Sequence, residues 1–291
     1  MPTRPLSQTR ICIVGLGLMG GSLAVALRGK CSGIVAVELD RGTREQAING
    51  GVVEFASKDL KEGVARADLL ILATPVQTII DLTNQLRGFP APKTNPLTVL
   101  DLGSTKNEIT KVMASLPRHF TPIGGHPMCG KETAGLTNAD AAIFSGATFA
   151  LTPLRRTTRD AMNLVHELVN AVDSHALVLD PERHDELASM TSHMPYLVAC
   201  SMLSAAADLS EDDELIWSLA ASGFKDMTRL AASDATVMLD ILRTNRMAVQ
   251  ESINRIRKAI NMMETLMFDD QDELERALQK IRTQRVSRFP Q

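Results

Sequence analysis

Residues 1–179 alternate between short apolar runs and stretches of helical periodicity. The apolar runs predict buried strands, and the periodic stretches predict helices. Strands are expected at residues 10–14, 33–38, 68–73, 97–101, 148–152 and 175–179, and helices at residues 22–28, 76–86, 106–116 and 158–172. Strands that alternate with helices indicate an α/β fold, here a doubly wound, parallel sheet of the Rossmann type.

The pattern changes at residue 180, beyond which nearly every stretch predicts helix. Asp180 and Pro181 match an N-cap followed by proline at the first helical position. A long helix is expected over residues 235–267, and another over residues 271–281 before a polar, frayed tail. We therefore predict an all-α domain over residues 180–291 that closes on substrate. The long helix is too apolar to be surrounded by water, so this domain is also expected to form a homodimer.

Composition narrows the class of partner. Hydrophobic residues make up 44% of the 291 residues, and the net charge is −3, which gives no electrostatic basis for binding nucleic acid or an anionic membrane. The four cysteines form no CxxC pair or metal-binding spacing. No apolar run reaches the roughly 18–20 residues that span a bilayer. We expect a cytoplasmic protein with reduced thiols, no metal site and a small-molecule substrate.

A glycine-rich segment lies between the first predicted strand and the first predicted helix. It matches GxGxxG, and an acidic residue closes the next strand about 20 positions later, as the dinucleotide fingerprint requires. The glycines allow a tight turn, a close approach to the pyrophosphate and close helix–strand packing. The helix N-terminus offers N–H groups to the phosphates. Residues 1–179 are thus expected to bind a dinucleotide through Gly15, Leu16, Gly17, Leu18, Met19 and Gly20.

The acidic residue at the end of the second strand bears on the choice of cofactor. Glu38 directly follows the apolar run, whereas Asp40 lies two residues further on. A carboxylate there accepts hydrogen bonds from the adenosine ribose and repels a 2′-phosphate. We therefore predict NAD bound through Glu38. NADP stays open, because Arg41 and Arg44 follow and offer partners for a phosphate.

Two further segments are expected at the same edge of the sheet, because ligands of such sheets bind beyond the carboxyl ends of the strands. Thr74 and Pro75 follow one predicted strand, and Ser104 follows the next. These residues are predicted cofactor contacts. The alternative for Ser104 is a helix N-cap, a role that Thr105 could equally fill.

A histidine lies in a segment rich in glycine and proline, Gly124-Gly125-His126-Pro127. Glycine permits unusual backbone geometry and proline stiffens the chain, so we expect His126 on a rigid, non-helical loop. Such loops often carry catalytic groups. The alternative is a turn with an ordinary surface histidine. Cys129 nearby is expected to be a bystander rather than a nucleophile.

Taken together, these segments and two others make the chain resemble the prephenate/arogenate dehydrogenases of tyrosine biosynthesis. The motifs are the glycine-rich segment, Asp101-Leu102-Gly103-Ser104-Thr105-Lys106, Gly125-His126-Pro127-Met128, His184-Asp185 followed by Ser192-His193-Met194-Pro195, and Gly223-Phe224-Lys225-Asp226-Met227-Thr228-Arg229. The first is shared by many dehydrogenases, whereas the ordered set is specific. The resemblance covers nearly the whole chain.

The resemblance implies an enzyme that oxidises the ring hydroxyl of a cyclohexadienyl acid with NAD or NADP and releases the ring carboxylate as CO2. It implies that His126 hydrogen-bonds the hydroxyl, with Ser104 orienting His126 or sharing that contact. Arg229 would bind a substrate carboxylate as a planar fork. Glu132 matches an acidic position that would bind substrate or gate its entry.

Helical geometry orders the remaining candidates. At about 100° per residue, Ser192 and Tyr196 lie about 80° and 120° from His184, whereas His193 lies about 180° away. We therefore expect His184, Ser192 and Tyr196 to face the substrate and His193 to be structural. Some family members carry histidine where this chain has Tyr196, which leaves prephenate and arogenate both open. A β-hydroxyacid dehydrogenase or an imine reductase is the alternative enzyme class, and the former would need Lys225 as its catalytic lysine.

Overall fold

The computed structural model describes residues 4–92 and 96–289. The chain forms two compact units, Met1–Arg246 and Met247–Gln291. The first unit holds an eight-stranded sheet and the helices that surround it. Among the described helices, none is long and apolar enough to cross a membrane.

The sheet has the strand order β3-β2-β1-β4-β5-β6-β7-β8. All neighbouring strands are parallel except β6 and β7. Only two short 3-10 turns lie between these two strands, so the chain returns beside β6 without a helical crossover. The strands are β1 Arg10–Val14, β2 Gly33–Val37, β3 Phe55–Ser57, β4 Leu69–Leu72, β5 Leu97–Asp101, β6 Phe120–Pro127, β7 Thr148–Pro153 and β8 His175–Val178.

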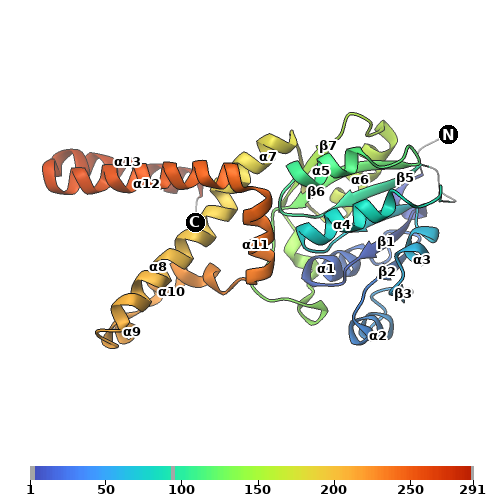
Figure 1. Cartoon of the computed structure of the whole chain (residues 1–291), viewed down its shortest axis with the longest axis horizontal. Coiled ribbons are helices and arrows are strands. Elements are labelled where there is room, and N and C mark those ends of the chain that lie inside the picture. Colours follow the sequence, from blue (N-terminus) through green and yellow to red (C-terminus); the bar gives the residue numbers. More distant parts are fainter. Residues whose placement is uncertain (1–3, 93–95, 290–291) are drawn as a thin grey trace. The chain divides into compact units, whose positions relative to one another are not determined.

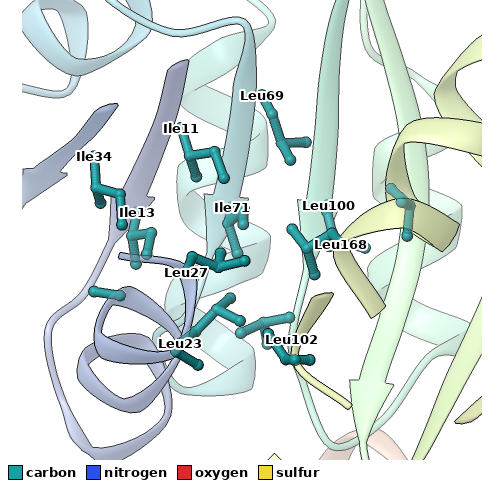
Figure 2. Packing of buried hydrophobic residues seen from close by; sticks show 14 of the residues in the cluster. Ile11, Ile13, Leu23, Leu27, Ile34, Leu69, Ile71, Leu100, Leu102 and Leu168 are labelled. Carbon is teal, nitrogen blue, oxygen red and sulfur yellow. The ribbon is translucent and has the colours of Figure 1, made fainter. Parts of the chain in front are cut away.

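Helices cover both faces of this sheet (Figure 1). Ile11 and Ile13 of β1 point to the face covered by α1 and α6, where they pack with Leu23 of α1 (Figure 2). Cys12 and Val14 alternate with them and pack against α3, α4 and α5 on the other face. Two apolar faces explain the unbroken apolar runs of the strands. The helices are α1 Leu18–Leu27, α2 Arg41–Asn49, α3 Leu60–Ala65, α4 Val76–Leu86, α5 Asn107–Ala114 and α6 Arg159–Ala171.

From residue 180 the chain is helical, as predicted, and α7 begins at Pro181 after the N-cap Asp180. After residue 180 the first unit contains α7 Pro181–Ala188, a π-helical segment Ser189–His193, α8 Met194–Ser210, α9 Leu215–Leu219, α10 Ser222–Thr228 and α11 Ala235–Thr244. Short 3-10 segments elsewhere in this unit are Leu6–Gln8, Leu136–Asn138, Ala141–Phe144 and Arg229–Ala232. The second unit consists of α12, Arg246–Asp269, and α13, Gln271–Arg288.

The predicted α/β fold class is confirmed, but three local expectations are wrong. The helix expected over residues 235–267 is broken at Asn245, which leaves helical geometry with φ −120° and ψ 29°. The tail expected to fray stays helical to Arg288. The segment expected to be a loop around His126 is the end of strand β6.

Candidate active site

The glycine-rich turn between β1 and α1 has the geometry that the fingerprint requires. Gly15 has a φ of +91°, and a Cβ built on it would lie 2.7 Å from the Thr74 side chain. A Cβ on Gly20 would overlap the carbonyl oxygen of Gly15. Only glycine therefore permits this turn and this packing.

Gly17 differs from the other two glycines, because space rather than protein surrounds its Cβ position. A Cβ built on Gly17 would meet no described atom within 4 Å, and no side chain caps the helix at this residue. The N-terminal N–H groups of α1 thus begin beside open space, as in helices whose N-termini bind phosphate. Of the neighbouring residues, Leu18 begins the helix and Met19 packs against the core.

Glu38 lies beside this turn at the end of β2. Its carboxylate accepts hydrogen bonds from the backbone N–H of Leu16 at 2.8 Å and of Asp40 at 3.0 Å. Asp40 has another role as the N-cap of α2, where the Thr43 N–H lowers the pKa of its carboxyl. Arg44 donates to the carbonyl oxygens of Glu38 and Leu39, both at 2.7 Å.

The other predicted cofactor residues lie at the carboxyl ends of the next two strands. Thr74 follows β4 and contacts the Gly15 turn, and Pro75 is the N-cap residue of α4. Ser104 follows β5. Neither Ser104 nor Thr105 caps α5, because the residue at the N-cap position is Lys106 and the capping acceptor comes from elsewhere in the chain.

His126 is the next-to-last residue of β6, where it pairs with Ala150 of β7. The glycines before it serve packing rather than a turn. A Cβ on Gly125 would lie 2.8 Å from the carbonyl oxygen of Asp101. The expectation of a loop was wrong because glycine and proline are rare inside strands, except where another backbone approaches closely.

The imidazole of His126 is only 8% exposed and contacts a second histidine. His126 Nδ1 and His184 Nε2 lie 2.9 Å apart, and His184 Nδ1 lies 2.8 Å from Asp185 Oδ1. Burial, and then the charges that His184 and Lys106 would carry, hold the pKa of His126 well below its usual value. His126 is thus a neutral, largely dry imidazole at the carboxyl end of the sheet.

Asp185 anchors this pair of histidines to the start of α5. Its two oxygens accept hydrogen bonds from the backbone N–H of Lys106 at 2.7 Å and of Asn107 at 2.9 Å. Its own carbonyl oxygen accepts a hydrogen bond from Asn245 Nδ2 at 2.8 Å. The sequence prediction missed both anchoring roles, although an asparagine that interrupts a helical pattern is a local signal of a helix end.

A fully buried ion pair lies beneath the strand that carries His126. Lys106 Nζ contacts the Asp101 carboxylate and donates to the carbonyl oxygen of Gly125 at 2.6 Å. Burial lowers the pKa of Lys106 and raises that of Asp101, and their mutual attraction opposes both shifts. The sequence prediction assigned Lys106 only to the start of a helix, since nothing local indicates that a lysine is buried.

The orientations predicted for the residues after α7 assumed the angles of a regular α-helix. Residues 189–193 form a π-helix, which turns less than 100° per residue, so the angles of a regular helix do not apply. His193 is fully buried with its Nδ1 3.2 Å from Asn245 Nδ2, whereas Ser192 is exposed. Burial lowers the pKa of His193 to about 4. Tyr196 is half-buried, and its contact with Cys200 raises its pKa.

Arg229 and Glu132 form an ion pair with each other. The Arg229 side chain is 58% exposed, so this pair holds it only weakly and leaves it accessible to another anion. Cys129 precedes Glu132 by three residues, and burial raises the pKa of its thiol to about 11. A thiol with so high a pKa is a poor nucleophile.

A dinucleotide-binding sheet with a buried neutral imidazole at its carboxyl edge defines a nucleotide-dependent dehydrogenase. The chain belongs to the prephenate dehydrogenase family. Residues 23–178 match the family's nucleotide-binding domain, and residues 180–280 match its dimerization domain.

Individual relatives match this chain over most of its length. The chain is 29% identical to prephenate dehydrogenase from Bacillus subtilis (strain 168), over 94% of this chain and 73% of the relative. It resembles the crystal structure of A. aeolicus prephenate dehydrogenase in complex with hydroxyphenyl propionate and NAD+, with a TM-score of 0.90, 26% identity and coverage of 98% and 100%. It also resembles Synechocystis arogenate dehydrogenase, with a TM-score of 0.79, 28% identity and coverage of 96% and 100%.

Proposed function

We propose that the protein oxidises and decarboxylates prephenate to 4-hydroxyphenylpyruvate, with NAD as the hydride acceptor, in the tyrosine biosynthesis of the cytoplasm. The observation that carries the proposal is the buried, neutral imidazole of His126 at the same edge of the sheet as the Gly15–Gly20 turn. The similarity to prephenate dehydrogenases over nearly the whole chain supports the same substrate class.

His126 supplies the group that the reaction needs at the ring hydroxyl. As hydride leaves the carbon that bears the hydroxyl, the hydroxyl proton must pass to a base, and a neutral imidazole accepts it. Nicotinamide, when bound, takes the hydride. The electrons of the bond to the ring carboxylate then complete the aromatic ring as CO2 departs, and the buried surroundings of His126 keep competing water away.

The decisive measurement follows the absorbance of reduced cofactor with prephenate and arogenate, each against NAD and NADP. Turnover of prephenate with NAD at the highest kcat/KM is expected. A lack of turnover with both acids, despite cofactor binding, would overturn the proposal.

Arogenate is the second candidate substrate. It shares the ring chemistry and differs in the side chain, which the half-buried Tyr196 is proposed to contact. The similarity to an arogenate dehydrogenase favours this candidate. Catalysis by lysine, as in a β-hydroxyacid dehydrogenase, has less support, because Lys225 is exposed on α10.

We infer NAD preference from the surroundings of Glu38. Its carboxylate is fixed by two backbone N–H groups at the turn that would hold the adenosine ribose. Of the two nearby arginines, Arg44 binds two carbonyl oxygens, whereas Arg41 pairs with Glu45 at 2.7 Å in an exposed position. The inference therefore rests on the carboxylate of Glu38 rather than on a lack of positive charge.

Replacing Glu38 with serine is expected to lower the ratio of NAD to NADP efficiency by about tenfold or more, because the substitution removes both the ribose acceptor and the repulsion of a 2′-phosphate. Steady-state kcat/KM with each cofactor measures the ratio. Asp40→Ser is the matched control, since Asp40 caps α2. An unchanged ratio in Glu38→Ser would show that another residue discriminates.

Arg229→Ala is expected to weaken prephenate binding by roughly 2–4 kcal/mol, because a substrate carboxylate loses its charged partner. The change should appear in KM for prephenate, whereas the Kd of NAD stays constant. Arg183→Ala is the matched control, since Arg183 is also an exposed arginine paired with a glutamate, Glu186. A defect confined to NAD binding would contradict this assignment.

The pH dependence of kcat/KM should reflect the lowered pKa of His126. The base acts in its neutral form, which predominates above its pKa, so activity is lost as the pH falls through that pKa. Because the pKa is lowered, the acidic limb is expected below about pH 6.5, the ordinary value for histidine. A limb above that value would contradict a neutral His126 in the free enzyme.

We also propose that the helices of residues 180–291 form a homodimer. In the second unit, α12 and α13 carry exposed apolar side chains, among them Ile260, Phe268 and Ile281. Water-exposed apolar faces of this kind are typical of association surfaces. The match of this region to a dimerization domain agrees with that assignment.

A further inference from the structure

Asp185 determines which atoms donate and which accept in the hydrogen bonds that link His126, His184 and Asp185. Both oxygens of its carboxylate receive backbone N–H groups, from Lys106 and Asn107. An ionised carboxylate is an acceptor only. The contact of 2.8 Å between His184 Nδ1 and Asp185 Oδ1 therefore requires the proton to be on His184 Nδ1.

The position of the proton on His184 in turn fixes the position of the proton on His126. When His184 carries a single proton, on Nδ1, its Nε2 has a lone pair and no hydrogen. That lone pair faces His126 Nδ1 at 2.9 Å. Two lone pairs at this distance would repel, so His126 Nδ1 carries a proton and donates it, which leaves Nε2 of His126 unprotonated.

We infer that His184 and Asp185 are positioning residues that hold His126 in the Nδ1-protonated tautomer, so that Nε2 is the atom that accepts the substrate's hydroxyl proton. The inference rests on the proposed function for the identity of that proton. His184 is then not the substrate contact that its sequence position predicted. It is 3% exposed and lies against Nδ1 of His126, the nitrogen that does not meet the substrate.

The same hydrogen bonds also stabilise His126 after it has accepted the proton. When the hydroxyl O–H bond breaks and the Nε2–H bond forms, His126 becomes a cation that still donates through Nδ1 to His184. The charge of Asp185 offsets that cation through the His184 ring. The anchoring of Asp185 by α5 and by Asn245 holds the chain of rings in place.

The tautomer is directly measurable in the full chain labelled with 15N at histidine. The sequence has only six histidines, so two-bond 1H–15N correlation spectra at pH 8 are sparse, and loss of one set of signals in His126→Asn assigns that ring. We expect a protonated Nδ1 and an unprotonated Nε2 for His126. A His126 ring protonated on Nε2 would overturn the inference, whatever the activity of the enzyme.

Two variants of similar length separate positioning from simple packing. His184→Gln places an amide oxygen where it can accept from His126 Nδ1, whereas His184→Met offers no such acceptor. We expect His184→Met to mix the two tautomers of His126 and to lower kcat by about tenfold to a hundredfold with KM for prephenate nearly constant. In His184→Gln, by contrast, His126 should keep mostly the Nδ1-protonated tautomer and kcat should stay close to that of the unaltered enzyme.

Equal losses in the two variants, with the tautomer of His126 unchanged, would show that His184 has only a packing role. If either variant fails to fold, the spectrum of the unaltered chain still decides the question. Failure of the proposed function is distinguishable, because it would appear as no turnover of either acid while the tautomer of His126 remained as inferred.

Discussion

Replacing His126 with asparagine is expected to lower kcat by a hundredfold or more while the Kd of NAD stays unchanged. General base catalysis by a placed side chain typically contributes about 10²–10⁴-fold, and an amide cannot accept the hydroxyl proton at neutral pH. Asparagine is smaller and polar, so the buried position at the end of β6 is kept without a new charge. Steady-state turnover and NAD titration measure the two quantities.

The matched control for this variant is His119→Asn. His119 immediately precedes the same strand, where its ring packs at a tilt against Phe120 with centroids 4.6 Å apart, and it lies at the opposite end of β6 from His126. Its replacement should leave kcat nearly unchanged. Full turnover in His126→Asn would refute the catalytic role of His126, whereas equal losses in both variants would point to damage to β6 itself.

Lys106→Met is expected to lower the free energy of unfolding by about 3–5 kcal/mol, because it leaves the carboxylate of Asp101 buried without its partner. It also removes the hydrogen bond to the carbonyl oxygen of Gly125, directly before His126. Urea unfolding of the two proteins measures the difference. The loss of this contact should lower kcat as well, since the backbone at His126 is less firmly held.

Two controls test whether the buried pair causes this effect. Lys111→Met removes an exposed lysine from α5, where the Lys111–Glu108 pair has side chains 60% and 47% exposed, and should cost under about 1 kcal/mol. Asp101→Asn combined with Lys106→Met removes both charges, keeps a side-chain oxygen for the buried N–H group of Gly103, and should regain much of the lost stability. A cost for Lys106→Met as small as that for Lys111→Met would contradict the account.

Local pattern was sufficient for the nucleotide-binding part. The GxGxxG turn, its flanking strand and helix, and Glu38 lie within one short stretch, and Gly20 is required by a near neighbour, the carbonyl oxygen of Gly15. The change to helix at Asp180 was equally local, because an N-cap and a proline define it. Such features follow from propensity and turn chemistry, which act over a few residues.

The residues that hold His126 in place, in contrast, come from distant parts of the sequence. His126 and His184 are 58 residues apart in sequence, and Asp185 is 79 residues from the backbone N–H group of Lys106 that it binds. The π-helical segment Ser189–His193 departs from the regular helix on which the orientation of these residues was predicted, and His193 within it is fully buried. Asn245 likewise ends α11 where its side chain binds the carbonyl oxygen of Asp185, 60 residues away.

The sequence by itself therefore determined the α/β fold, the nucleotide-binding turn and the helical second half, because each depends on periodicity or on contacts between near neighbours. Only the tertiary structure decided that His126 lies on a strand, which groups hold its imidazole and that Lys106 is buried. Those properties depend on distant segments meeting around one strand end, and neither periodicity nor local propensity records which segments will meet.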